Sequence, residues 1–194
     1  MKKIISGSTL KILAMIFMVI DHFGQVVLKN GIILNAPYSM FTDEQFDMLM
    51  SAVNICHILG RISFPIFCFL LVEGFFHTHS LKKYILSLGI FALISEPIYD
   101  LANTGNLFSL EQQNVLFTLS LGLIILTTIN KFNKNVIISC ATIAIGAYTS
   151  YICNLDGWYY GIALISVFYL FHDIPVLKYT ASILVMYICG LNFT

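Results

Sequence analysis

The segment "MVIDHFG", residues 18–24, places a carboxylate and an imidazole side by side inside a long apolar run. Other ionisable side chains interrupt the apolar runs that follow, and the set comprises Asp21, His22, His57, Arg61, Glu73, Glu96 and Asp100. Side chains of these types pair as ions, pass protons or hold charged ligands. What they do here depends on the elements that carry them and on the medium around those elements.

The composition favours a membrane protein. Of 194 residues, 58% are hydrophobic and 10% are charged, whereas a soluble domain carries about 25% charged residues. Too little polar surface is left to cover a water-soluble body of this size. The formal net charge is zero and no basic tract occurs, so nucleic acid is not an expected partner. Five scattered cysteines lack metal-ligand spacing, so we expect no metal site.

Seven apolar segments predict an all-α protein with seven transmembrane helices in one domain, residues 1–194, because a span needs about 20 mostly apolar residues. The segments cover residues 9–29, 53–77, 82–101, 114–130, 136–153, 157–172 and 175–193. Lys2 and Lys3 precede the first segment as in a signal peptide, but no small-x-small cleavage site follows it. We therefore expect an uncleaved first span.

Two capping boxes mark expected helix starts. Thr42 to Gln45 has the pattern in which a threonine side chain and a glutamine side chain cap one helix end reciprocally. It predicts a helix from about residue 43, ahead of the second span. Ser109 to Gln112 repeats the pattern and predicts a helix start just before the fourth span.

The lysines orient the chain in the membrane. With seven spans and a cytoplasmic N-terminus, eight basic residues fall on the cytoplasmic side: Lys2, Lys3, Lys11, Lys82, Lys83, Lys131, Lys134 and Lys178. Lys29 is the one lysine that falls outside. The acidic loop residues also fall outside, and they are Asp43, Glu44, Asp47, Glu111 and Asp156. This positive-inside asymmetry predicts a multi-pass protein of the cell membrane with its C-terminus outside.

One face of the first span carries regularly spaced side chains: Lys11, Met15, Met18, His22 and Gln25. At the rise of an α-helix, Lys11 and His22 lie about 16 Å apart along the axis. Lys11 would then sit at the cytoplasmic mouth and His22 deeper on the same track. Asp21 points about 100° away from His22. It is therefore expected to partner Arg61 or a neighbouring helix.

Three of the predicted spans bring ionisable groups to the outer half of the membrane. These groups are Asp21, His22, His57, Arg61, Glu96 and Asp100, while Glu73 lies toward the cytoplasm. A charge at bilayer depth costs about 2.5–3.5 kcal/mol on insertion scales and normally faces a bundle interior or a cavity. We therefore expect a polar cavity in the outer half, reached from a basic cytoplasmic mouth.

A purely structural role is the alternative for several of these side chains. Arg61 paired with a carboxylate can simply lock helices together, and His57 can be a satisfied interhelical hydrogen-bonding group. His77 and His79 are expected to be solvated loop residues, with a role beside Lys82 and Lys83 in anion binding as the minor alternative. His172 has no indicated role beyond that of a histidine at a helix end.

Several stretches match a known family block by block. They are "LKILAMIFMVIDHFG" (10–24), "GRISFPIFCFLLVEGFFHT" (60–78), "KKYILSLGIFALISEPIYDL" (82–101), "NVLFTLSLGL" (114–123) and, more loosely, "DGWYYGIALISVFYLF" (156–171). These resemble the conserved blocks of the TraX family, named for the protein that N-acetylates conjugative pilin. That family in turn resembles the integral-membrane acyltransferases that use cytoplasmic acyl-CoA. Those enzymes carry a basic residue, ten intervening positions and a catalytic histidine on an early span, and Lys11 to His22 reproduces this spacing.

The resemblance implies transmembrane acetyl transfer with acetyl-CoA as co-substrate. Lys11, Lys82 and Lys83 would hold its phosphates at the cytoplasmic mouth. His22 would act as the base or carry the acetyl group covalently.

The remaining site residues receive supporting roles from the same resemblance. Asp100 or Glu96 would orient the ring of His22 or stabilise the imidazolium. Arg61 would stabilise the developing oxyanion or hold Asp21. Asp21 and Glu73 are expected to be supporting residues.

The acceptor and two other function classes stay open at the level of sequence. The expected acceptor is a pilin-like peptide N-terminus, with a sugar or lipid hydroxyl or another secreted peptide as alternatives, so membrane lipid is also a possible partner. A small proton-coupled transporter would also place such charges at midplane depth. A non-catalytic membrane assembly factor would use the charges only to pair helices.

Overall fold

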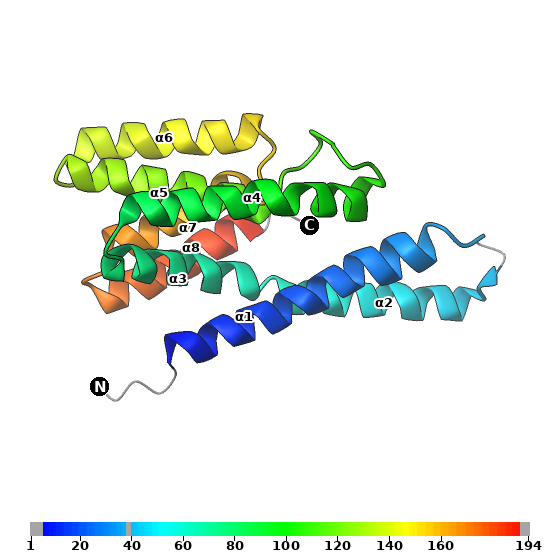
Figure 1. Ribbon diagram of the computed structural model, residues 1–194. Coiled ribbons are helices and arrows are strands. Elements are labelled where there is room, and N and C mark those ends of the chain that lie inside the picture. The colour runs from blue at the N-terminus through cyan, green and yellow to red at the C-terminus, as the bar shows by residue number, and fades with distance from the viewer. Residues whose placement is uncertain (1–5, 38–39, 191–194) are drawn as a thin grey trace. The chain divides into compact units, whose positions relative to one another are not determined.

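The computed structural model describes residues 6–37 and 40–190, and within these ranges the chain is all-α, as predicted (Figure 1). The elements are α1 (Gly7–His22), η1 (Phe23–Ile33), α2 (Asp43–Gly60), α3 (Ser63–His77), α4 (Leu81–Thr104), α5 (Val115–Lys131), α6 (Val136–Ile152), α7 (Trp158–Leu170) and α8 (Pro175–Gly190). Two predictions concern residues outside the described ranges. They are the cytoplasmic location of Lys2 and Lys3, and the end of the seventh apolar segment at 191–193.

The chain forms two compact units, residues 1–70 (unit 1) and residues 71–194 (unit 2). In unit 1, α1 and its continuation η1 pack along α2 (Figure 1). The backbone changes from α-helix to π-helix immediately after His22. His22 therefore occupies the last position of the regular helix. π-Helical stretches are rare and are frequently found at functional sites.

Two glycines allow α1–η1 and α2 to approach closely. A Cβ atom built on Gly24 would lie 2.5 Å from Cβ of Cys56, and one built on Gly60 would overlap the side chain of Asp21. Ala14 and Val53, also in this hairpin, are buried. The small side chains thus set how near the two helices come.

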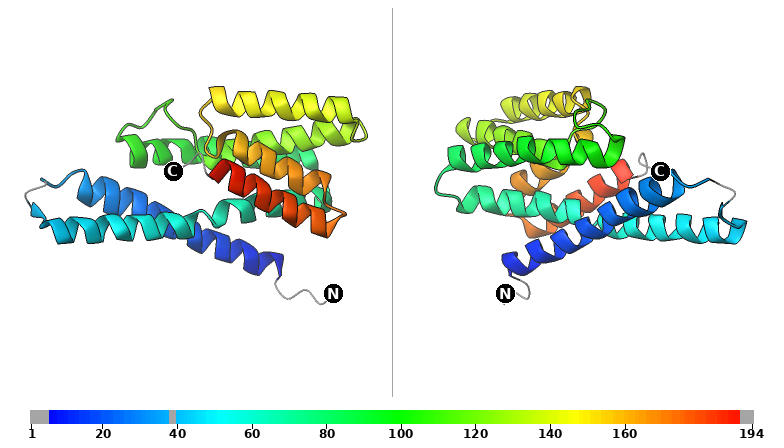
Figure 2. Two further views of the ribbon diagram at one scale, coloured as in Figure 1. Left: turned by 180° about the vertical axis from the view of Figure 1, so that it is seen from behind. Right: turned by 45° about the vertical axis from the view of Figure 1, so that its right-hand side comes forward.

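Unit 2 is built around α5 and α7. Helix α5 packs against α4, α6 and α7, and α7 packs against α6 and α8 (Figures 1 and 2). The side chains buried on these two central helices include Leu123, Leu126, Ile129, Ile162, Leu164 and Ile165. Their apolar faces therefore form the core that positions the polar groups of this unit.

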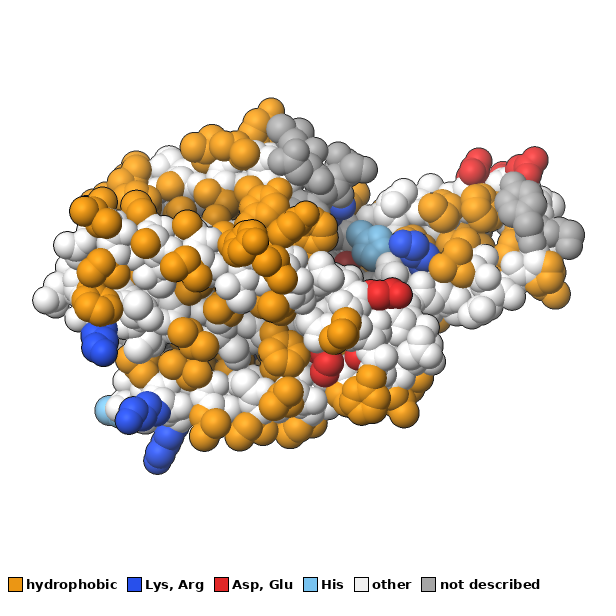
Figure 3. Space-filling view, turned by 90° about the horizontal axis from the view of Figure 1, so that it is seen from above, with side chains coloured by type: hydrophobic (Ala, Val, Ile, Leu, Met, Phe, Trp, Pro, Cys, Tyr) orange, Lys and Arg blue, Asp and Glu red, His pale blue; other side chains and the backbone are white. Residues whose placement is uncertain are grey.

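Within the described residues, three helical stretches are by length and composition able to cross a membrane: Gly7–Ile33, the interrupted stretch Asp43–His77, and Leu81–Thr104. The apolar helices Val115–Lys131, Val136–Ile152, Trp158–Leu170 and Pro175–Cys189 are shorter. Large apolar side chains cover much of the outer surface (Figure 3). On α4, for example, Leu93 is 65% and Ile98 is 72% exposed. Such a surface suits lipid better than water.

The second predicted span is not one regular helix. The segment expected at 53–77 is interrupted at Arg61 and Ile62, between α2 and α3. Pro65 explains the break, because it has no N–H to donate and its ring clashes with the carbonyl four residues earlier. The Ser63 hydroxyl donates to the Gly60 carbonyl at 2.8 Å across the turn. Arg61 is consequently the C-cap of α2.

One predicted capping box is confirmed and the other is wrong. The backbone N–H of Gln45 donates to the Thr42 hydroxyl at 3.3 Å, and the Thr42 N–H donates to Oε1 of Gln45 at 3.1 Å. Helix α2 begins there, at Asp43. No helix begins at Ser109, whose hydroxyl accepts from the N–H of Glu111. Helix α5 starts later because Asn114 caps it.

Candidate functional site

In unit 1, Asp21 of α1 and His57 of α2 form a hydrogen-bonded pair across the helix crossing. Oδ1 of Asp21 lies 2.9 Å from Nδ1 of His57. The two side chains are 35% and 28% exposed, respectively. Of the two partners that the sequence allowed for Asp21, the neighbouring helix is the one found in the described residues.

Lys11 and His22 lie on α1, and both are exposed. Met15, between them on the predicted track, is 45% exposed, so this face of the helix is not covered within unit 1. The ring of His22 makes no hydrogen bond or ion pair among the described residues of that unit. Within unit 1, both ring nitrogens of His22 are therefore left without a partner.

Arg61 stands at the C-terminal end of α2, exposed to its surroundings. Among the described residues of unit 1, no carboxylate forms an ion pair with it. Its guanidinium lies at the turn between α2 and α3 rather than inside a regular helix. The predicted pairing of Arg61 with Asp21 is thus not present, because Asp21 binds His57.

In unit 2, Glu96 and Asp100 each anchor the segment that links α4 to α5. The N–H of Asn114 donates to Oε2 of Glu96 at 3.1 Å, and the Asn114 side-chain amide also donates to that oxygen. The N–H of Ser109 donates to Oδ2 of Asp100 at 2.8 Å. Asp100 is almost fully buried, at 2% exposed.

The second oxygen of each of these carboxylates is buried without a hydrogen-bond partner in the described chain. These atoms are Oε1 of Glu96 and Oδ1 of Asp100. The two residues share one face of α4, as the i, i+4 spacing predicted. This arrangement brings two carboxyl groups together near the C-terminal end of α4.

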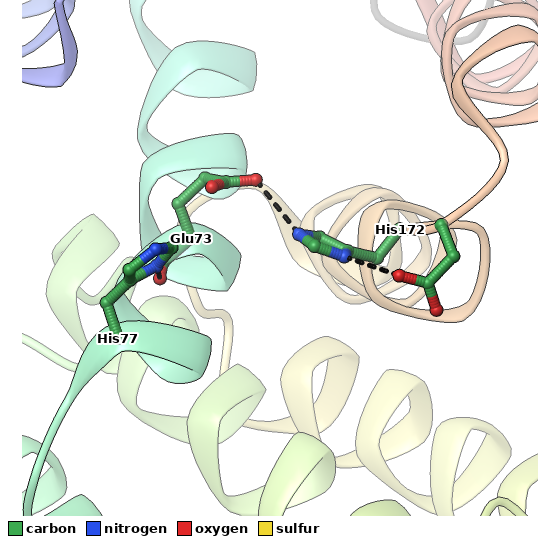
Figure 4. A network of polar contacts seen from close by, with 4 residues as sticks. Glu73, His77 and His172 are labelled. Atoms are coloured by element: carbon green, nitrogen blue, oxygen red, sulfur yellow. Dashed lines mark hydrogen bonds and ion pairs between the residues drawn. The ribbon is translucent and has the colours of Figure 1, made fainter.

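Unit 2 also contains a histidine network that the sequence did not indicate (Figure 4). Nε2 of His172 lies 3.2 Å from Oε1 of Glu73, and Nδ1 of His172 lies 3.2 Å from Oδ1 of Asp173. Nδ1 of His77 also donates to the Glu73 carbonyl at 2.8 Å. Both ring nitrogens of His172 are therefore occupied by carboxylate contacts, and neither is open to another partner.

Aromatic rings pack beside this network at the same end of unit 2. The rings of Phe76 and His172 have centroids 4.2 Å apart, and the ring of Phe76 stacks on Tyr169 with centroids 5.5 Å apart. The Tyr169 hydroxyl donates to Oδ1 of Asn130 at 3.1 Å, and Nζ of Lys134 lies 5.1 Å from the Tyr169 ring centroid. These contacts tie α3, α5 and α7 together.

Comparison with known proteins identifies the family. Residues 6–194 match the family described as TraX protein. The chain belongs to the TraX family. The predicted membership is therefore confirmed, and every described site residue, from Lys11 to Asp100, falls inside the matched region.

A curated relative gives this TraX-family chain its context. The chain is 34% identical over 128 residues to the "Probable fimbrial assembly protein FimC, serogroup H1" of Dichelobacter nodosus. The match covers 62% of this chain and 45% of the relative, so the chain spans less than half the length of that protein. No solved structure matches.

The histidines of this TraX-family chain differ in their partners. The ring of His22 has none among the described residues of unit 1, and His57 is held at one nitrogen by Asp21. His77 is held at one nitrogen by the Glu73 carbonyl, and His172 is held at both nitrogens. The exposed Lys82 and Lys83 lie in the first turn of α4. Chemically, such a chain has cations for an anionic ligand and imidazoles for proton transfer.

Proposed function

We propose that this protein is an integral-membrane acetyltransferase. It transfers the acetyl group of cytoplasmic acetyl-CoA to an acceptor reached from the outer side of the cell membrane. In this proposal the apolar helices form seven spans, with Asp43–His77 as one interrupted span. The N-terminus is cytoplasmic and the C-terminus lies outside.

The observation that carries the proposal is the free imidazole of His22, eleven positions after Lys11 on one helix. Both side chains are exposed, and His22 is the last residue before the backbone becomes π-helical. A neutral imidazole with an accessible nitrogen takes a proton near neutral pH or attacks a carbonyl. Membership of the TraX family supports this proposal, since the resemblance to that family implies acetyl transfer.

The proposed reaction consists of binding acetyl-CoA and transferring its acetyl group. Lys11, Lys82 and Lys83 attract the phosphates of acetyl-CoA, because each is an exposed cation. The acceptor nitrogen or oxygen forms a bond to the acetyl carbon, the carbon–sulfur bond breaks, and CoA leaves as the thiol. His22 acts as the base or carries the acetyl group between donor and acceptor. The roles expected for Glu96, Asp100 and Arg61 stay predictions.

The acceptor proposed first is the N-terminal amine of a pilin-like peptide. The fimbrial assembly protein of Dichelobacter nodosus is a relative whose name concerns fimbriae, which are built from pilin-like subunits. A hydroxyl acceptor on a lipid or sugar is the alternative within the same reaction class.

The test is a direct transfer assay with the full chain purified in detergent. Acetyl-CoA is supplied with an apolar peptide that has a free N-terminus, and with the same peptide blocked at its N-terminus. The proposal expects free CoA to appear together with a peptide heavier by one acetyl group. It also expects the blocked peptide to gain none. Absence of both CoA release and mass gain, also with hydroxyl acceptors, would contradict the enzyme.

A non-catalytic fimbrial assembly factor is the second candidate, and the name of the Dichelobacter nodosus relative favours it. In that case the carboxylate–histidine pairs only hold helices together. Cells that express His22→Ala would then assemble fimbriae normally. The acetyltransferase proposal instead expects those cells to lose the acetyl group on the acceptor.

A further inference from the structure

We propose that His57, oriented by Asp21, is the catalytic base that removes a proton from an amine acceptor. This inference rests on the acetyltransferase function proposed above and divides the work between two histidines. His57 takes the proton, so His22 is left to receive the acetyl group or to contact the thioester. The acceptor class that needs this base is a primary ammonium, such as a peptide N-terminus.

The hydrogen bond decides which nitrogen of His57 can act. Oδ1 of Asp21 is 2.9 Å from Nδ1 of His57. An ionised carboxylate only accepts hydrogen bonds, so the proton of the neutral ring resides on Nδ1. The lone pair is then on Nε2, which has no hydrogen-bond partner among the described residues. A carboxylate behind Nδ1 also stabilises the imidazolium that forms when Nε2 takes a proton.

The backbone around the pair is held on both sides. Gly60 leaves room for the Asp21 side chain, and Gly24 faces Cys56, the neighbour of His57, where a Cβ would lie 2.5 Å from Cβ of Cys56. The pair is thereby fixed at a close helix crossing rather than on a mobile loop. Such support is what a catalytic base needs to keep its orientation.

The other histidines described above are in different chemical states. His172 has a carboxylate at each ring nitrogen, so neither nitrogen is open to a substrate. The ring of His22 has no carboxylate partner among the described residues of unit 1. His57 combines a bound nitrogen with a free one, and its side chain is 28% exposed. It is thus both oriented and reachable.

The proposed step balances without any further reactant. The acceptor ammonium gives one proton to Nε2 of His57 and becomes a neutral amine. Its nitrogen then forms a bond to the acetyl carbon, and the bond from that carbon to sulfur breaks. The amine's second transferable proton goes to the departing sulfur, which gives CoA thiol and the amide. If His22 carries the acetyl group, the carbon–nitrogen bond to its ring breaks instead and the ring regains that proton.

The test uses the dependence of rate on pH in the full chain purified in detergent. His57→Gln and Asp21→Asn are compared with the control replacements Glu44→Gln and Asp47→Asn, which alter exposed residues outside the pair. Acetyl transfer to a peptide with a free N-terminus is measured at saturating acetyl-CoA from pH 6.5 to pH 9.5. Gel filtration and thermal unfolding report whether each variant is folded.

We expect His57→Gln to lower kcat about 100-fold or more below pH 7, as loss of a general base does. The defect shrinks above about pH 8, where a peptide amine is already deprotonated in solution. Asp21→Asn gives the same convergence, because an amide favours the wrong ring tautomer. The two control variants keep the wild-type rate and profile.

Two results overturn the inference, and they are distinguishable from failure of the enzyme itself. An unchanged kcat in His57→Gln would show that His57 is not the catalytic base. A loss of equal size at every pH indicates that the pair only holds the helices together. If His57→Gln does not fold, the profile of Asp21→Asn decides between the same outcomes. A wild-type chain that transfers no acetyl group overturns the proposed function, and this inference with it.

Discussion

At the scale of residues, the partner at each ring nitrogen separates the histidines by what they can do. His57 is held at one nitrogen by Asp21, and His172 is held at both by Glu73 and Asp173. Only a nitrogen with a free lone pair can take a proton or attack a carbonyl. These contacts therefore favour His57 and His22 for chemistry and give His172 a bridging role between α3 and α7.

Lys11 provides a prediction at this scale. If it binds the phosphates of acetyl-CoA, Lys11→Ala removes an interaction made equally by bound donor and transition state. Such a change raises KM and leaves kcat nearly constant. A loss of about tenfold in kcat/KM is expected for one exposed cation, and Lys29→Ala, outside the proposed mouth, is the control. An unchanged KM for acetyl-CoA would refute the assignment.

Sequence analysis could identify these groups but not all of their partners. Asp21 was expected to bind a neighbouring helix or Arg61, and the helical spacing could not select His57. Glu73 and His172 are 99 positions apart. Their contact depends on how α3 and α7 pack, which no local spacing encodes. One indication of this contact was that the predicted topology placed both Glu73 and His172 toward the cytoplasm.

At the scale of elements, local signals predicted helix ends well where the side chain caps its own backbone. Thr42 is such a case, since every partner lies within three residues. The helix start predicted at Ser109 was wrong because Asn114 caps α5 instead. Asn114 also donates to the Ala92 carbonyl of α4, a contact that no local pattern can show. The break before Ser63 follows from Pro65, a signal that the apolar pattern hid.

The close crossing of α1 and α2 gives a prediction for Gly60. Its replacement by alanine places a Cβ against the side chain of Asp21, so the helices must move apart. Overpacking of this kind typically costs about 1–3 kcal/mol, and it also displaces the Asp21–His57 pair.

Gly7→Ala is the matched control, because a Cβ on Gly7 meets nothing within 4 Å. Alanine in a helix is favoured by roughly 0.5–1 kcal/mol over glycine, so the control should be neutral or stabilising. Unfolding in a detergent–denaturant titration measures both variants. Equal stability of the two would contradict the described crossing.

Asn114 gives a second prediction for the elements. It caps α5 through Leu116 and also donates its side-chain amide to the Ala92 carbonyl at 2.9 Å and to Glu96. Asn114→Ala should cost about 2–3 kcal/mol, from the lost cap and from the unpaired buried acceptors. Asn135→Ala removes the exposed cap of α6 and should cost about 1 kcal/mol. Equal costs in unfolding titrations would show that the contacts to α4 contribute nothing.

At the scale of the whole molecule, family membership and the apolar surface point to a membrane protein, while the number of crossings is still a prediction. Three helices have the length for a full span. Helix α7 has 13 residues, or about 20 Å at the rise of an α-helix, against a hydrocarbon core of about 30 Å. Short helices can cross where flanking residues or a thinner bilayer make up the difference.

Reporter fusions test this topology. A reporter joined after Asn133, between α5 and α6, should be active in the cytoplasm, and one joined after Asn154, between α6 and α7, should be active outside. The expectation follows from the positive-inside distribution of Lys131 and Lys134 against Asp156. Reporters active on the same side would show that α6 does not cross the membrane.

Comparison of wild type with His22→Ala in the purified transfer assay tests the role of His22 most directly. We expect wild type to convert acetyl-CoA and a free-amine peptide to CoA and acetylated peptide. His22→Ala should elute and unfold as wild type does, since its ring makes no hydrogen bond or ion pair among the described residues of unit 1. Its kcat should nevertheless fall by about 100-fold or more. A folded His22→Ala chain with wild-type activity would contradict the account.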